Sequence, residues 1–237
     1  MPAIVPIEYL DLRVDPAPWE LAERNRTAID AHFAELQRGN PAMWNGRILL
    51  LASHRVEDRT LIGRYKETDF ASMMWWRDNG HPDPDIRNAF AMGALRGADG
   101  GFVLARMAGW TANAGRIYFA AGTPDLSDIT PDGGVDLQGS VLRELEEETG
   151  LSTSDVVAAP NWTVVFDGPR IALMRPLVAH ASTDEIADRI RAFAATQERP
   201  EIAEVVIAHG PGDLTEAMPD FIRAYLRYVW EGGEQGG

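Results

Sequence analysis

The sequence contains no cysteine in its 237 residues. This excludes disulfide bonds, zinc sites built on thiolates and catalysis by a cysteine nucleophile. Long apolar runs are missing too, because none approaches the roughly 20 residues of a membrane-spanning helix. The opening residues, MPAIVPIEYLDLRVDP, lack the basic start of a secretory signal. We therefore expect a cytoplasmic protein that is not associated with a membrane.

Basic residues are the other scarce group. Lys and Arg total 22 against 36 Asp and Glu, which gives a formal net charge of −14. An acidic surface repels the phosphate backbone of nucleic acids, so we expect no nucleic-acid partner. A small anionic substrate would be repelled as well, unless its site carries a cation of its own.

The remaining composition, 45% hydrophobic and 24% charged, is ordinary for a globular protein. Strand-like and helix-like segments alternate, and some strands are joined as hairpins, which predicts an α/β protein with a mixed sheet covered by helices. Residues 1–90 are predicted to be an N-terminal extension packed on the core, with a helix over 16–38 and a hairpin over 46–67. Residues 91–230 are expected to form the core, and 231–237 a disordered tail.

The segment RELEEETG, from Arg143 to Gly150, carries the densest cluster of acidic residues. It falls in a predicted helix over 136–149, where Glu144, Glu147 and Glu148 are spaced i, i+3 and i+4 and therefore share one face. Arg143 lies four residues before Glu147 and is within reach of it.

Two interpretations of this acidic face are open. Charge runs are most often solvated helix surfaces. Alternatively, a hard divalent cation reverses the mutual repulsion of the carboxylates, and oxygen ligands of this kind suit Mg²⁺ or Mn²⁺. Such a cation would also bring an anionic substrate to an acidic protein.

The residues around the cluster favour the second interpretation. RELEEETGL, Arg143 to Leu151, resembles the second half of the Nudix hydrolase signature: Arg-Glu, an aliphatic residue, any residue, Glu-Glu, any residue, Gly and an aliphatic residue. The resemblance implies an α/β/α sandwich that hydrolyses a nucleoside diphosphate linked to another moiety. It also implies Mg²⁺ or Mn²⁺ held by Glu144, Glu147 and Glu148.

The first half of that signature departs from the family pattern. Counting back from Arg143, the opening Gly falls on Ile129 and the first Glu on Val135. An alignment that opens at Gly122 and places an insertion after it fits better. On that alignment Gly122 supplies a backbone carbonyl to the metal.

The expected roles follow from this resemblance. Arg143, Glu147 and Glu148 are predicted catalytic residues, and Glu147 or Glu148 is the first choice for the general base. Glu201 and Glu204 are alternative bases outside the helix, although surface charge is the more common role for such residues.

Three basic residues are predicted to contact substrate, because Arg and Lys bind phosphates well. They are Arg64, Lys66 and Arg87. The order of elements before the signature faintly resembles the Nudix branch that cleaves UDP-glucose and UDP-galactose, so a nucleotide sugar is the first expectation. Coenzyme A or ADP-ribose are alternative substrates. A non-catalytic nucleotide-binding Nudix-fold sensor is the alternative class, and a homodimer is a further expectation from the family.

Overall fold

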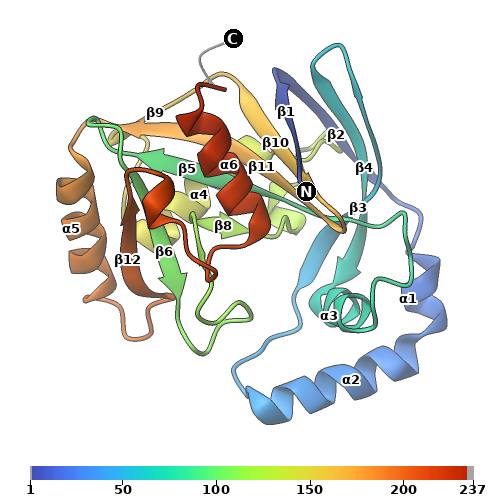
Figure 1. Ribbon diagram of the computed structural model, residues 1–237. Helices are drawn as coiled ribbons and strands as arrows, with labels where there is room; N and C mark the ends of the chain where they lie inside the picture. Colours follow the sequence, from blue (N-terminus) through green and yellow to red (C-terminus); the bar gives the residue numbers. More distant parts are fainter. Residues whose placement is uncertain (1, 234–237) are drawn as a thin grey trace.

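The computed structural model describes residues 2–233, and their strands form two neighbouring sheets (Figure 1). The strands of the larger sheet are β1 (Ala3–Ile7), β5 (Asn88–Arg96), β6 (Phe102–Met107), β7 (Ile117–Tyr118), β8 (Ala121–Gly122), β9 (Val156–Ala158), β10 (Trp162–Asp167), β11 (Arg170–Ala179) and β12 (Ile202–Ala208). Their order is β1-β10-β11-β5-β6-β12, and the short strands β7, β8 and β9 pair with β6, β5 and β11.

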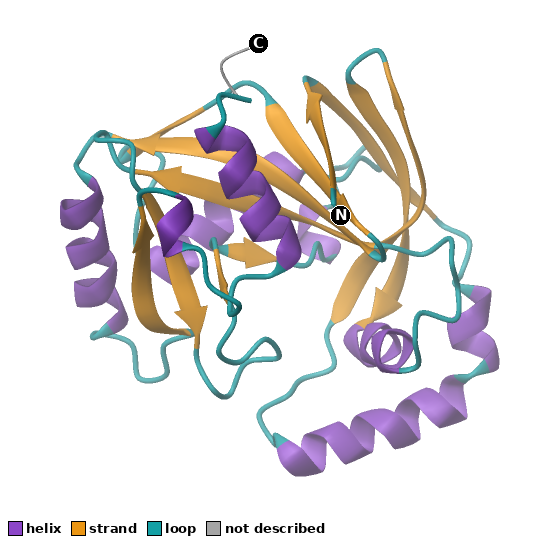
Figure 2. Cartoon of the chain, viewed as in Figure 1, coloured by secondary structure: helices purple, strands orange, loops and turns teal. Residues whose placement is uncertain are grey.

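The larger sheet is mixed, because β11 runs parallel to β5 and antiparallel to β10. Helices α4 (Leu137–Thr149) and α5 (Thr183–Ala194) contribute to the hydrophobic core on one face, and α6 (Asp220–Trp230) to the core on the other (Figure 2). Short 3-10 helices are η1 (Leu126–Asp128) and η2 (Pro211–Asp213). The α/β class with a mixed sheet covered by helices is therefore confirmed.

Strand β11 shows how the two cores are separated. Successive strand residues point to opposite faces of a sheet. Leu173 and Leu177 accordingly join the core that contains α4, whereas Ala172 and Met174 join the core that contains α6. All four side chains are fully buried, so both faces of this strand are covered.

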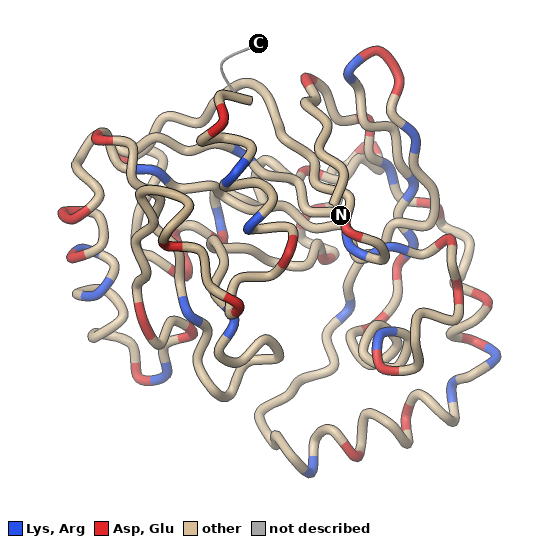
Figure 3. The backbone as a smooth tube through the Cα atoms, in the orientation of Figure 1, with Lys and Arg blue, Asp and Glu red and all other residues tan. Residues whose placement is uncertain are grey.

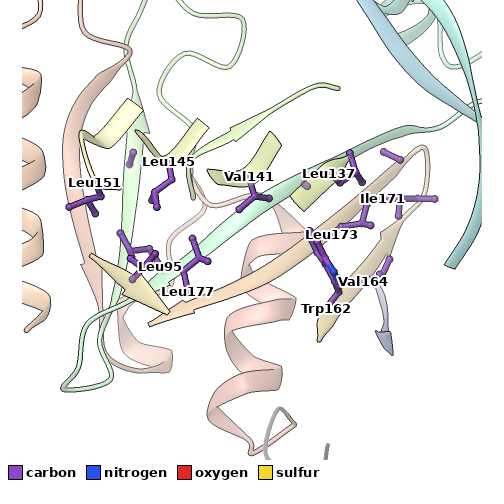
Figure 4. Packing of buried hydrophobic residues seen from close by; sticks show 14 of the residues in the cluster. Leu95, Leu137, Val141, Leu145, Leu151, Trp162, Val164, Ile171, Leu173 and Leu177 are labelled. Atoms are coloured by element: carbon purple, nitrogen blue, oxygen red, sulfur yellow. The ribbon is translucent and has the colours of Figure 1, made fainter. Parts of the chain in front are cut away.

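Helix α4 forms where the sequence predicts it. Asp136 caps its start by accepting a hydrogen bond from the backbone N–H of Gly139 at 2.9 Å. Val141 and Leu145 point toward Leu177 and its neighbours across the core (Figure 4). The helix ends at Gly150, whose φ of 69° is left-handed and easiest for glycine. The apolar contacts fix which face of the helix carries its glutamates.

The smaller sheet has the strand order β2-β4-β3 and packs with the N-terminal helices. Its elements and these helices are β2 (Tyr9–Asp15), α1 (Glu20–Arg24), α2 (Arg26–Gly39), β3 (Arg47–Glu57), β4 (Thr60–Asp69) and α3 (Phe70–Asp78). The hairpin predicted over 46–67 is the β3–β4 pair. Leu49, Leu51 and Tyr65 belong to the same hydrophobic core as α4, so this sheet is joined to the larger one by side-chain packing.

Two features of the N-terminal segment differ from the sequence-based expectation. The helix predicted over 16–38 is two helices, because at Asn25 the backbone leaves helical geometry and the amide side chain bonds Leu21 O at 2.7 Å. The division of the chain at residue 90 stays a prediction. Two segments before residue 91 nevertheless belong to the larger sheet: β1 is paired within it, and β5 begins at Asn88.

The predicted tail over 231–237 is described only in part. Residues 231–233 form a turn after α6, and residues 234–237 lie outside the described part of the chain. No helix within residues 2–233 is long and apolar enough to cross a membrane.

Candidate active site

The three predicted metal ligands lie on α4 with very different exposure. Glu148 is buried, with 8% of its surface exposed, and the side chain of Glu144 is 19% exposed. Glu147 is exposed. Figure 3 shows acidic and basic residues interspersed on most elements, so the charge excess is spread over the molecule. A buried carboxylate such as Glu148 is therefore a local exception that needs its own explanation.

The pKa values of two of these glutamates are strongly raised. Burial, with the neighbouring charge of Glu147, raises the pKa of Glu144 to about 7, and Arg143 acts in the opposite direction. Burial raises the pKa of Glu148 well above its ordinary value, and Glu144 and Glu201 add to the effect. The carboxylates thus repel one another in a poorly solvated place, and a cation would relieve this repulsion.

Residues Ala121 and Gly122 of β8 lie directly against these carboxylates. The backbone N–H of Ala121 faces the Glu148 carboxyl and lowers its pKa somewhat. A Cβ built on Gly122 would lie less than 3.0 Å from Oε1 of Glu144, a separation that real Cβ atoms essentially never show. β8 is held there by pairing with Ala91 and Met92 of β5. Any larger residue at position 122 would therefore force the Glu144 carboxyl to move.

Arg143 has a different partner from the expected one. Its Nη1 donates to Oδ1 of Asp128 at 3.0 Å, and its Nη2 lies 3.8 Å from Oε1 of Glu144. The expectation that Arg143 holds Glu147 is thus not met. Asp128 belongs to the irregular segment after Gly122, where no local pattern in the sequence points to an ion pair 15 residues away.

The two alternative bases outside the helix occupy different environments. Glu201 lies just before β12, and the surrounding protein and the charge of Glu147 raise its pKa. Glu204 lies on β12 and forms an ion pair with Nε of Arg106 at 2.6 Å. Glu201 is therefore close enough to the glutamates of α4 to interact with them, whereas Glu204 is engaged elsewhere.

Two properties of the glutamates on α4 suit a divalent cation: the type of their donor atoms and one buried oxygen without a hydrogen-bond partner. All the candidate ligands are oxygen donors, and within residues 2–233 the buried Oε2 of Glu148 has no hydrogen-bond partner. However, no group of three or more acidic or histidine side chains in the described part of the chain is already close enough to share one ion. At least one of Glu144, Glu147 and Glu148 has to rotate to complete such a group.

A cavity of about 320 Å³ opens beside β8. Ala121 and Gly122, which contact the carboxylates, also line this cavity. The residues that line it are Asn88, Phe90, Met92, Asn113, Arg116, Tyr118, Ala121, Gly122, Thr123, Arg170, Glu216, Met218, Pro219, Asp220, Phe221 and Arg223. Its size is in the usual range for small-molecule sites.

Three arginines of this cavity are absent from the sequence-based prediction. Arg116 makes no ion pair with another described residue, Arg170 pairs with Asp167 at 2.7 Å, and Arg223 pairs with Asp220. They come from separate elements, so neither spacing nor composition could bring them together. The only available signal was their positive charge in an acidic chain.

The predicted substrate contacts lie away from this cavity. Arg64 and Lys66 are on β4, where Nζ of Lys66 pairs with Asp15 at 2.7 Å. Arg87 precedes β5 and donates to Ile86 O at 2.9 Å. The structure therefore brings none of the three to the cavity beside β8, and their role in substrate binding stays a prediction.

Comparison with known proteins gives a limited result. No family model and no curated protein matches the sequence. Similar solved structures include the Nudix hydrolase RenU from M. smegmatis (14% identity, TM-score 0.39, 63% of this chain and 86% of that chain). The MutT protein from Methanosarcina mazei Go1 has 17% identity and a TM-score of 0.39, over 62% of this chain and 96% of that chain.

A third similar structure is the Bacillus subtilis pyrophosphohydrolase BsRppH. It has 11% identity and a TM-score of 0.38, over 82% of this chain and 98% of that chain. At this level of similarity the assignment of a function depends on the residues of the site.

Proposed function

We propose that the protein is a metal-dependent hydrolase of the Nudix type, which cleaves the diphosphate bond of a nucleoside diphosphate linked to another moiety. One observation carries the proposal. Ala121 and Gly122 contact the glutamates of α4 on one side and line a cavity of about 320 Å³ on the other. None of the three glutamates lines the cavity, so β8 is the link between a molecule bound there and the carboxylates.

The metal, Mg²⁺ or Mn²⁺, is assigned to Glu144, Glu147 and Glu148, with the carbonyl of Gly122 as a further ligand. When bound, such an ion lowers the pKa of a water ligand and neutralises charge on phosphate oxygens. The same ion would offset the repulsion that raises the pKa values of Glu144 and Glu148. It would also attract an anion to a chain whose net charge is −14.

Glu148 or Glu147 is assigned as the general base that removes the proton of the attacking water. Glu148 is favoured because its Oε2 is buried and has no hydrogen-bond partner within residues 2–233. Burial raises its pKa, which makes the ionised carboxylate a stronger base. Glu201 is the alternative outside the helix, since its pKa is raised in the same direction.

The arginines that line the cavity are proposed to bind the phosphates of the substrate and the group attached to them. Arg116 is the first of these, because its guanidinium makes no ion pair with another described residue. Arg170 lies with its guanidinium carbon 5.4 Å from the ring centre of Phe221, which fixes a cation at the wall of the cavity. A nucleotide sugar is the proposed substrate. The protein is proposed to act as a homodimer in the cytoplasm.

A substrate panel tests the proposal. The full chain is incubated with Mg²⁺ or Mn²⁺ and UDP-sugars, ADP-ribose, NADH or coenzyme A, and the products are separated by chromatography. Release of UMP from a UDP-sugar, abolished by a chelator, is the expected result. Nucleotide binding without hydrolysis of any compound would favour the sensor class, and UMP release from none of the sugars would remove the nucleotide-sugar assignment.

A further inference from the structure

Asp128 is a buried acid to which the proposed reaction gives no role. Its side chain is 1% exposed and lies at the end of η1, in the segment that connects β8 to α4. Oδ1 accepts from Nη1 of Arg143 at 3.0 Å, and Oδ2 accepts from the backbone N–H of Asp125 at 2.9 Å. Both carboxyl oxygens are thus used within the protein, which fixes this charge in one position.

Arg143 is held between Asp128 and Glu144. The contact with Asp128 is a charge-assisted hydrogen bond, whereas the 3.8 Å from Nη2 to Oε1 of Glu144 is too long for one. One guanidinium therefore serves two carboxylates and lies nearer the one that is not a candidate ligand. If Asp128 were neutral, Arg143 would be free to close on Glu144 and to compete there with a cation.

The segment that carries Asp128 is anchored to the smaller sheet on both sides. The backbone N–H of Leu49 donates to Pro124 O at 2.7 Å before it, and the N–H of Val135 donates to Leu12 O at 2.9 Å after it. These bonds come from β3 and β2. The N-terminal unit therefore fixes the backbone from which Asp128 reaches Arg143.

We propose that Asp128 is a positioning residue that holds Arg143 away from Glu144 and so keeps Glu144 available to bind a divalent cation. This inference rests on the proposed function, because it concerns the same site. It assigns a role to the insertion after Gly122 and to the sheet that anchors it. Together they set the position of the Arg143 guanidinium beside the metal ligands.

The first test measures Mn²⁺ binding to the full chain without substrate, from the electron paramagnetic resonance signal of free Mn²⁺. Asp128→Asn keeps the shape of the side chain and removes its charge. We expect its Kd for Mn²⁺ to rise about 10- to 100-fold, the usual cost of losing a group that orients a metal ligand. In hydrolysis assays kcat should fall by a similar factor while KM changes by less than about twofold.

Asp132→Asn is the matched control. Asp132 lies in the same segment, its side chain is 73% exposed, and its removal subtracts the same charge. It should bind Mn²⁺ as the unmodified protein does. An equal loss in both variants would mean that only the net charge of the segment matters, which would overturn the proposal.

A double-mutant cycle tests whether Asp128 acts through Arg143. If it does, Asp128→Asn combined with Arg143→Gln should bind Mn²⁺ no more weakly than Arg143→Gln alone. Additive losses would overturn the proposal. Should Asp128→Asn fail to fold, Arg143→Lys replaces it, because lysine keeps the charge but cannot span both carboxylates. Its Kd should rise about tenfold, and an unchanged Kd would contradict the inference.

The same measurements separate this inference from the proposed function. If the unmodified chain binds Mn²⁺ and Asp128→Asn binds it equally well, the inference is wrong and the proposed function stands. If the unmodified chain binds no Mn²⁺, the proposed function fails and the inference fails with it.

Discussion

Gly122 lies directly against the carboxyl group of Glu144. A Cβ at position 122 would come within 3.0 Å of Oε1 and of the carboxyl carbon of the glutamate. This contact joins a strand of the larger sheet to the face of α4 that carries the candidate ligands. It couples a backbone position to the placement of one carboxylate.

Gly122→Ala should therefore displace Glu144. Displacing a reacting group by about 1 Å commonly costs about 100-fold in rate, so we expect a loss of this order in kcat together with weaker Mn²⁺ binding. Gly109→Ala is the control, because nothing lies within 4 Å of a Cβ built there. Full activity in Gly122→Ala would show that the glycine is not required by the site.

Glu148→Gln should abolish turnover without unfolding the protein. Removing a general base typically costs 100-fold or more, while glutamine has nearly the same shape. Burial raises the pKa of Glu148, so holding it ionised at pH 8 is unfavourable to folding, and the metal-free variant should melt no lower than the unmodified protein. Glu146→Gln, an exposed change on the same helix, should leave both the rate and the melting temperature unchanged. Near-normal activity of Glu148→Gln would remove its catalytic assignment.

Glu144 should make the metal-free protein less stable as the pH rises. Its pKa is raised from an ordinary value near 4.5 to about 7, so between these values the folded state keeps a proton that the unfolded chain has lost. This contribution is fully present below about pH 4.5 and is lost as the pH rises through about 7, on the order of 1–3 kcal/mol.

Thermal unfolding of the unmodified protein and of Glu144→Gln, at several pH values from 5 to 8 and with a chelator present, measures this contribution. The melting temperature of the variant should fall less over this range. Added Mg²⁺ should stabilise the unmodified protein more at pH 8 than at pH 6, since the ion binds the deprotonated carboxyl. Equal pH dependence in the two proteins would contradict the raised pKa.

The arginines of the cavity and those predicted from the sequence can be compared directly. A charge-assisted hydrogen bond contributes about 1.5–3 kcal/mol, so Arg116→Ala should raise KM about tenfold or more with little change in kcat. Arg64→Ala, on the smaller sheet, should change KM by less than about twofold. The reverse pattern in steady-state kinetics would favour the sequence-based assignment over the cavity.

The sequence predicts best what depends on neighbouring residues. The helix predicted over 136–149 from its spacing and capping residues forms over 137–149 and ends at Gly150. The partner of Arg143 could not be predicted in this way, since Asp128 approaches it only through the tertiary fold. Arg116 is placed in the cavity in the same way, by strands whose pairing is invisible to local patterns.

The first strands were missed for a related reason. Residues 3–7 form β1 only because β10 pairs with them, from Ala3 opposite Phe166 to Ile7 opposite Trp162. The segment has no regular apolar alternation of its own, and its partner lies far along the chain. Tertiary pairing thus overrides a weak local signal.

Strand β1 also limits how the protein can be shortened. It is the outermost strand beside β10, so a fragment that starts at residue 88 would lose it and leave the backbone donors and acceptors of β10 open. Open strand edges recruit other chains. Such a fragment is therefore expected to self-associate, and a shortened version that keeps residues 3–7 tethered to the larger sheet is the better design for isolating that sheet.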